Sequence, residues 1–525
     1  MIELTLLNWL LALAPVLTVL VLMLGFGRSG GQAGIAAFAV ALVAALVAFG
    51  GGPAVIGVAL GKSIFLALDV LLIVWMALFF YNVTNEAGAL DTLGRALPSL
   101  TSDRAAQSLL VSWVFVSLLQ GVGGFGVPVA VVAPLLVGLG YTATQAVMMS
   151  SLGHGWAVTF GSLGTSFVAL TAVTGLDGSV FASEAAMMLG AAAFVSGGLV
   201  AYVATGWRGL LRGLPFLLVV GAAMAFVQWF VATRGIWTLG ATTGALAGAF
   251  VGVGMCFTPL YRTGAVEPPP AAEDDTEGES KPRPTLLFAL MAYAVLLVIA
   301  FSINLVPLLE RIFDAVQLRI AFPEVTTRLG VATPAENSRA ISLFGHPGTL
   351  LFYAGAIAFW VYRSRGYYES GVWGAIWGKV TKSARKSTIA IFTLVGMAAV
   401  MTHTGMTALI AQGISETVSA SVYPLFAPLI GTLGAFMTGS NTNSNVVFGA
   451  LQQQTAGLLG LSVPLILAAQ TAGASLGSVL APAKVIVGCS TVGLSGQEGE
   501  VIRRMILLGL LPVLLLAIAV WLLAT

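Results

Sequence analysis

Charged residues are scarce in this chain. Only 8 % of its 525 residues are Asp, Glu, Lys or Arg, against about 25 % in soluble domains, whereas 58 % are hydrophobic. Such a composition is typical of a polytopic α-helical membrane protein that lives in the lipid bilayer. The net charge of +2 indicates neither a nucleic-acid partner nor a polybasic lipid anchor.

Cysteine and histidine are scarce as well. The two cysteines, Cys256 and Cys489, both lie in apolar surroundings and suggest neither a disulfide framework nor a metal site. The three histidines are far apart, without clustered carboxylates, and both the H-E-x-x-H motif and the phosphate-binding P-loop are missing. The sequence therefore predicts no enzyme, no cofactor and no metal.

Composition divides the chain into two halves, 1–262 and 285–525. The run between them, 263–284, is rich in proline and acidic residues and cannot bury enough apolar surface to fold. It is predicted to be a disordered linker, with partner binding as the alternative. Residues 308–346 have balanced charge, and an extramembrane cap of short helices is expected there. The basic segment from Arg363 to Lys386 should face the cytoplasm.

The most informative stretch is QGVGGFGVP, from Gln120 to Pro128, between the apolar runs Leu109–Leu119 and Val129–Leu139. Each run has about a dozen residues, whereas a helix needs about 20 to cross a bilayer. The pair predicts a re-entrant helical hairpin over about 106–139. Bare glycine amides at a helix start attract anions, as in broken-helix transporters. The predicted substrate-binding residues of this tip are Gln120, Gly121, Gly123, Gly124 and Gly126.

Other interpretations of this loop exist. Its spacing also fits G-x-G-x-x-G, but a dinucleotide site needs a preceding strand and an acid about 20 residues on, and the chain offers neither. The glycines could instead let transmembrane helices pack closely. A second stretch, MTGSNTNSNVVFGALQ from Met437, favours binding, because it predicts another hairpin over about 423–456 and hence inverted repeats. The predicted binding residues of the second tip are Ser440, Asn441, Thr442, Asn443 and Asn445.

Two titratable residues inside apolar segments are candidates for ion coupling. Asp69 is costly within a span and marks either an ion path or a salt bridge with the nearby Lys62. His154 lies in a glycine-interrupted segment, about 143–170, that predicts a helix broken beside the site. This histidine binds substrate or carries a proton, or is a neutral, hydrogen-bonded core residue.

Three further polar residues are candidates. Gln470 follows the second hairpin in a small-residue helix and is predicted to contact substrate. Lys484 either extends to the membrane interface or neutralises a bound carboxylate. His403 lies in a polar break that either lines the path or ends a helix.

Three strings carry a resemblance to a known family. QGVGGFGVPVAVVAPLLVGLG, TGSNTNSNVVFGALQ and LGSVLAPAKVIVGCSTVGLSGQEG resemble the bacterial L-lactate permease family, secondary transporters that move lactate or glycolate, typically with protons. The resemblance covers nearly the whole chain and implies symport across the bacterial plasma (inner) membrane. The family motif has a glutamate and an aspartate where this chain has Gln120 and Asn441. Substrate class therefore carries over, while proton or sodium coupling stays open, with Asp69 and His154 as candidates.

The predicted fold is an all-α polytopic membrane protein with inverted repeats and two re-entrant helical hairpins, similar to the ion transporter superfamily. By fold-level analogy, the hairpin-bearing part moves elevator-like against a homodimeric scaffold. The predicted function is secondary active transport of a small monocarboxylate, a 2-hydroxy acid such as L-lactate or glycolate. The alternative is an uncoupled organic-anion facilitator or channel, with a Gly- and Asn-lined pore that conducts without alternating access.

Overall fold

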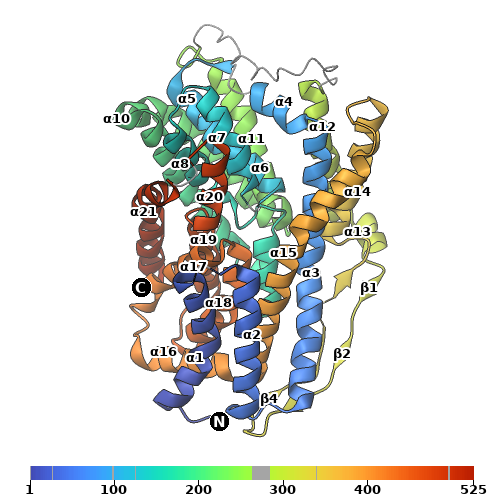
Figure 1. Ribbon diagram of the computed structural model, residues 1–525, viewed down its shortest axis with the longest axis vertical. Helices are drawn as coiled ribbons and strands as arrows, with labels where there is room; N and C mark the ends of the chain where they lie inside the picture. Colours follow the sequence, from blue (N-terminus) through green and yellow to red (C-terminus); the bar gives the residue numbers. More distant parts are fainter. Residues whose placement is uncertain are drawn as a thin grey trace.

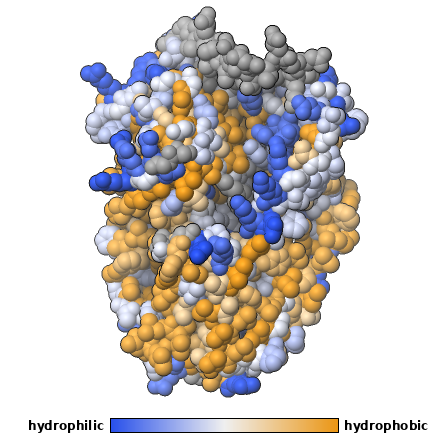
Figure 2. Space-filling model, in the orientation of Figure 1, coloured by the Kyte–Doolittle hydropathy of each residue, from blue (hydrophilic) through white to orange (hydrophobic). Residues whose placement is uncertain are grey.

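The computed structural model describes residues 2–26, 28–96, 100–124, 126–262, 284–338, 340–494 and 497–524. The predicted linker, 263–284, lies outside these ranges apart from Pro284. Nine of the described helices are long and apolar enough to cross a membrane. Hydrophobic residues cover most of the face shown in Figure 2, and hydrophilic ones gather toward the top and at mid-height. The polytopic helical class predicted from composition is thus confirmed.

Helices make up almost all of the first half. Its helices are α1 (Leu6–Leu20), α2 (Gly30–Val47), α3 (Pro53–Glu86), α4 (Ala89–Ala96), α5 (Arg104–Leu109), α6 (Val116–Val122), α7 (Val127–Gly138), α8 (Ala143–Gly153), α9 (Thr165–Thr174), α10 (Ala182–Ala232) and α11 (Gly240–Cys256). The long α10 is interrupted at Thr205 and Gly206, which have non-helical backbone angles. It therefore consists of two helical segments joined at a kink.

The second half adds ten helices and six short strands among the described residues. The helices are α12 (Leu286–Leu305), α13 (Pro307–Phe313), α14 (Pro347–Ser364), α15 (Val372–His403), α16 (Met406–Thr417), α17 (Tyr423–Thr438), α18 (Asn441–Leu458), α19 (Val463–Ser478), α20 (Pro482–Thr491) and α21 (Glu498–Ala524). The strands are β1 (Gln317–Leu318), β2 (Ala321–Phe322), β3 (Val325–Thr326), β4 (Ala332–Thr333), β5 (Glu336–Asn337) and β6 (Ile341–Ser342).

The expectation of a cap of short helices over 308–346 is wrong beyond α13. The strands pair antiparallel as β1 with β6, β2 with β5 and β3 with β4, which makes one long β-ribbon. Apolar and polar residues alternate along the first half of the ribbon, which is the pattern of a strand. Its prolines disfavour a helix. The ribbon lies along α3 (Figure 1), where Phe322 packs over Gly61 and Val325 contacts Val55 and Val58.

Two groups of helices pack against each other (Figure 1). The framework helices are α1, α2, α3, α12, α14 and α15, among which α15 packs along both α2 and α3. The site-bearing helices are α5 to α11 and α17 to α21, among which α17, α18 and α19 pack together and α10 packs on α11. The two groups meet where α15 contacts α18 and α3 contacts α9. We call this boundary the seam.

Both halves repeat one order of elements among the site-bearing helices. A tightly linked helix pair is followed by an interrupted helix: α6 and α7 precede α8 and α9, and α17 and α18 precede α19 and α20. The break expected in 143–170 is confirmed, because α8 ends at Gly153 and α9 begins at Thr165. The first arm is longer than predicted, since α5, a π-helical stretch and α6 follow one another from Arg104 to Val122.

The second tip is short, because most of its polar residues belong to a helix. Only Gly439 and Ser440 separate α17 from α18, so the polar run from Asn441 forms the first turn of a helix. Gly439 ends α17 in the left-handed conformation, with φ of 69°, as helix-terminating glycines commonly do. The Ser440 hydroxyl then accepts the Asn443 backbone N–H at 3.3 Å and caps α18.

Candidate functional site

The first tip is fastened to the interruption between α8 and α9. The backbone N–H of Ser162 donates to the Gln120 carbonyl at 2.8 Å, and that of Leu163 to the Gly121 carbonyl at 3.1 Å. Ser162 and Leu163 have φ of 47° and 55°, a region that non-glycine residues rarely adopt. Gln120 is buried, its Nε2 lies 3.4 Å from the Ser162 Oγ, and its Oε1 has no hydrogen-bond partner among the described residues.

The glycines of the first tip have neighbours of two kinds. A Cβ at Gly121 would lie 2.6 Å from a side chain of α11, and one at Gly123 would lie 3.0 Å from a ring on α3. These two glycines therefore permit close packing, as the alternative interpretation expects. A Cβ at Gly124 would instead lie 2.2 Å from the Ser162 hydroxyl. Gly126 has φ of 90° and begins α7, a backbone that favours glycine.

Two asparagines of α18 hold the second tip against both interrupted helices. The Asn441 Nδ2 donates to the Thr159 Oγ1 at 3.0 Å and to the Thr471 carbonyl at 3.4 Å. The Asn445 Nδ2 donates to the Thr471 Oγ1 and to the Ser166 carbonyl, both at 2.9 Å. Each Oδ1 is buried and has no partner in the described part of the chain. Their amide oxygens are thus free to accept a hydrogen bond.

The four helix interruptions meet in one place, which we call the junction. Ser475 of α19 donates from Oγ to the Gly155 carbonyl at 2.7 Å and accepts the Thr159 backbone N–H at 3.1 Å. A Cβ on Gly439 would lie 4.0 Å from Ala481, in the turn between α19 and α20. The two tips and the two broken helices therefore share one buried, hydroxyl-rich region.

A buried lysine and a buried histidine accompany the junction. Lys484 is 6 % exposed, with Nζ 3.2 Å from the Ser478 Oγ, which disagrees with extension to an interface. Within the described chain no carboxylate forms a salt bridge with it. The His154 Nδ1 lies 2.7 Å from the Ser150 carbonyl. Because a carbonyl only accepts, this nitrogen carries the hydrogen, and the neutral ring's Nε2, unpartnered among described atoms, is an acceptor.

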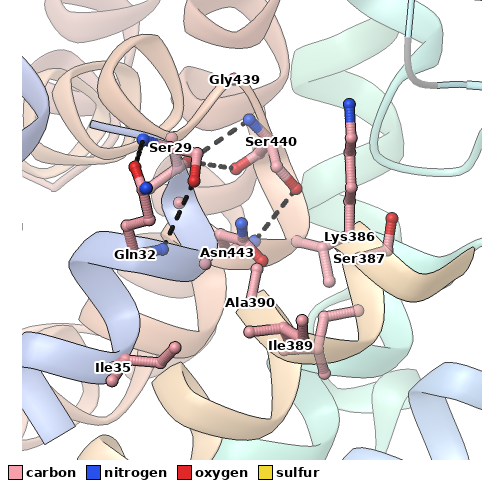
Figure 3. A pocket seen from close by; sticks show the side chains of 15 residues that line it. Ser29, Gln32, Ile35, Lys386, Ser387, Ile389, Ala390, Gly439, Ser440 and Asn443 are labelled. Atoms are coloured by element: carbon pink, nitrogen blue, oxygen red, sulfur yellow. Dashed lines mark hydrogen bonds between the residues drawn. The ribbon is translucent and has the colours of Figure 1, made fainter. Parts of the chain in front are cut away.

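A cavity of about 390 Å³ opens at the second tip (Figure 3). Its walls are the starts of α2 and α18 together with the middle of α15. The predicted residues that line it are Ser440, Thr442 and Asn443. Two helix N-termini converge here, and Lys386 joins them, so the cavity attracts anions. The described residues that line it include no carboxylate.

Asp69 and Gln470 have partners of their own. Asp69 lies on the framework helix α3. Its Oδ1 is 3.0 Å from the Nε2 of His346. Lys62, the alternative partner from the sequence, has its Nζ 2.6 Å from the Glu336 Oε1. Gln470 bonds to other arm residues: its Oε1 accepts from the Gln452 Nε2 at 3.0 Å. Gln470 is not among the residues that line the cavity.

Several residues of the junction and cavity were not singled out from the sequence. Thr159 and Ser166 are ordinary in an apolar helical segment, and only the fold brings them to the asparagines of α18. Ser29 could have been identified from the sequence as a helix cap, because S-x-x-Q before an apolar run is the motif of a capping box. The structure shows both hydrogen bonds of that box. Lys386 belongs to the basic segment that indicates the cytoplasmic side, and only the fold places it at the cavity.

The spans, the paired and interrupted helices and the anion-attracting cavity define a multi-pass membrane transporter. The family model described as L-lactate permease matches residues 8–525. The chain therefore belongs to the L-lactate permease family, as its motifs indicate.

Individual relatives agree with this assignment. The chain is 27 % identical to the L-lactate permease of Bacillus subtilis (strain 168), over 98 % of this chain and 96 % of the relative. It is 26 % identical to the glycolate permease GlcA of Escherichia coli (strain K12), over 82 % and 80 %. In fold it is similar to the YdaH transporter of Alcanivorax borkumensis, with a TM-score of 0.50 at 15 % identity, over 90 % of this chain and 87 % of that one.

Proposed function

We propose that this protein is a secondary transporter of a small 2-hydroxy monocarboxylate, L-lactate or glycolate, which works by alternating access in the plasma membrane. The names of its relatives supply the substrate class. The observation that carries the mechanism is a buried junction of four helix interruptions that holds a lysine without a carboxylate partner among described residues. A buried cation of this kind favours binding an anion.

The substrate's two functional groups match two side chains at the junction, Lys484 and His154. The Lys484 ammonium donates to the carboxylate, and the His154 Nε2 accepts the 2-hydroxyl hydrogen. The unpartnered oxygens of Gln120, Asn441 and Asn445 are further acceptors. They suit a hydroxyl or a cation better than a second anion. The cavity at the second tip supplies the route for the anion.

Two cavities along the seam support alternating access. The first is lined by α15 residues 386, 387 and 389–391, and a second, of about 420 Å³, by α15 residues 395–403. One turn of α15, about 5 Å long, separates the two sets. The basic segment that precedes the first cavity orients it to the cytoplasm by the positive-inside rule. The second cavity then serves the opposite face.

The finer mechanism follows from the same elements. The two tightly linked pairs, α6 with α7 and α17 with α18, act as re-entrant hairpins of inverted repeats, as in the ion transporter superfamily. The site-bearing helices move against the framework as an elevator, with a homodimer as the scaffold. The side-chain amides of Gln120 and Asn441 neither take up nor release a proton at physiological pH, so coupling falls to Asp69 and His154 or to sodium.

A binding screen tests the proposal on purified protein. Short carboxylates are added while thermal unfolding is followed, and L-lactate or glycolate should raise the midpoint in a saturable way. Lys484→Gln should abolish this shift. The control is Lys379→Gln, which alters an exposed lysine paired with Glu86, and this variant should keep the shift. The proposal fails if no 2-hydroxy acid stabilises the wild type, and the assigned site fails if Lys484→Gln responds like the control.

A further inference from the structure

The second seam cavity has a chemistry that the junction does not explain. It lies between the framework and the site-bearing helices, and its polar lining includes Lys62, Thr174, Glu336, Asn337, Thr402 and His403. The β-ribbon contributes Glu336 and Asn337, α3 contributes Lys62, and the end of α15 contributes His403. The cavity's 420 Å³ exceed the volume of a small hydroxy acid severalfold.

The ion pair in this cavity is asymmetric. The Lys62 side chain is 8 % exposed, whereas that of Glu336, whose Oε1 lies 2.6 Å from the Lys62 Nζ, is 56 % exposed. The buried cation needs an anion next to it, while the exposed glutamate can return to water at little cost. Another carboxylate that enters the cavity can therefore replace Glu336 on Lys62.

His403 adds a hydrogen-bond acceptor to the same cavity. Its Nδ1 lies 2.8 Å from the Ala399 carbonyl, so this nitrogen carries the hydrogen and the neutral ring's Nε2 carries a lone pair. The Nε2 is buried and has no partner among the described residues. A hydroxyl donor on a bound acid would satisfy it. The pairing of lysine with an acceptor histidine repeats the chemistry of Lys484 and His154 in the junction.

We infer that this cavity is a second, entry-side binding site for a 2-hydroxy carboxylate. Lys62 binds its carboxylate, His403 accepts its hydroxyl hydrogen, and Glu336 is the counter-ion that the substrate displaces. Glu336 stays in reach because the ribbon is fixed: it lies opposite Phe322 in the register, and the Arg328 backbone N–H donates to the Gly50 carbonyl at 2.9 Å. The inference rests on the proposed function and names an additional site for the same substrate class.

Initial uptake of radiolabelled L-lactate into right-side-out and inside-out vesicles tests the inference. On one face only, Glu336→Gln should lower the KM at least threefold, because the competing carboxylate is gone. Lys62→Gln should raise it more than tenfold on that face. His403→Leu should reduce the preference for L-lactate over propionate, which lacks the hydroxyl, at least fivefold there. The opposite face should keep wild-type values in all three variants.

The matched control is Glu86→Gln, which breaks another lysine–glutamate pair, with Lys379, outside the cavity. It should change neither face. If Glu336→Gln, Lys62→Gln and His403→Leu behave like this control, or change both faces equally, the entry site is refuted while the transporter stands. If the wild type takes up no 2-hydroxy acid from either face, the proposed function is refuted and the entry site with it.

Discussion

Replacing Asn441 by aspartate is the most informative single change at the second tip, because it tests whether this buried position can hold a carboxyl group. Asn441 is 1 % exposed, and its Nδ2 uses two hydrogens, toward the Thr159 hydroxyl and the Thr471 carbonyl. The Thr159 hydroxyl already donates to that carbonyl at 3.0 Å. An ionised carboxylate at position 441 has no hydrogen for either acceptor, so only the protonated acid fits.

The magnitude follows from these contacts. Loss of one of two neutral hydrogen bonds costs about 1 kcal/mol. Holding an aspartate protonated at pH 7, given the usual aspartate pKa of about 3.9, costs about 4 kcal/mol more. The folded form keeps a proton that the unfolded chain releases, so the stability of Asn441→Asp should fall as pH rises, by about 1.4 kcal/mol per unit. Asn441→Ala loses both bonds without a charge, and its deficit should be about 2 kcal/mol at every pH.

Thermal unfolding of detergent-purified protein between pH 5.5 and 8 measures both deficits against the wild type at each pH. The gap between Asn441→Asp and the wild type should narrow steadily toward pH 5.5, while the gap for Asn441→Ala should stay constant. The reasoning is refuted if the aspartate variant has the same deficit at all pH values. A variant as stable as the wild type at pH 8 would show that the carboxylate is accommodated in some other way.

Other residues give shorter tests. Gly124→Val should abolish substrate binding, since its Cβ would lie 2.2 Å from the Ser162 Oγ and displace the first tip, and binding at wild-type affinity would show that the first tip does not form the site. A reporter fused near residue 374, in the basic segment, should score cytoplasmic, and a periplasmic score would reverse the assigned orientation. Asp69→Asn should keep exchange yet lose accumulation driven by a pH gradient if Asp69 carries the proton. Unchanged accumulation would limit Asp69 to its bond with His346.

The membrane class and the broken helices were predictable because they depend on local sequence. The scarcity of charged residues predicts a membrane protein. Glycines at positions such as 153 and 164 mark the interruption between α8 and α9. Each polar tip lies between two short apolar runs, and this pattern predicted the two helix pairs. The β-ribbon was missed because a two-residue strand has no local signal of its own and depends on a partner elsewhere in the sequence, as Phe322 does on Glu336.

The contacts of the site depend on long-range packing and could not be predicted. Thr159 and Asn441 are bonded although they are 282 positions apart, and no local pattern marks either one's partner. The sequence offered Asp69, in the same helix, as one possible partner of Lys62, but the ribbon brings Glu336 from 274 positions away. The helix start at the second tip was not predicted, because Asn, Thr and Ser also favour turns; in the structure Gly439 and the Ser440 cap fix it at Asn441.

Counterflow in proteoliposomes tests most directly whether this protein is a carrier for 2-hydroxy carboxylates. Vesicles are loaded with unlabelled L-lactate at high concentration and diluted into trace radiolabelled L-lactate, without any ion gradient. A carrier with alternating access takes up the label transiently above its external concentration, and the initial rate saturates. We expect this overshoot for the wild type and its loss in Lys484→Gln. Label entry that only equilibrates, at a rate that rises linearly with concentration, would contradict the account and identify a channel.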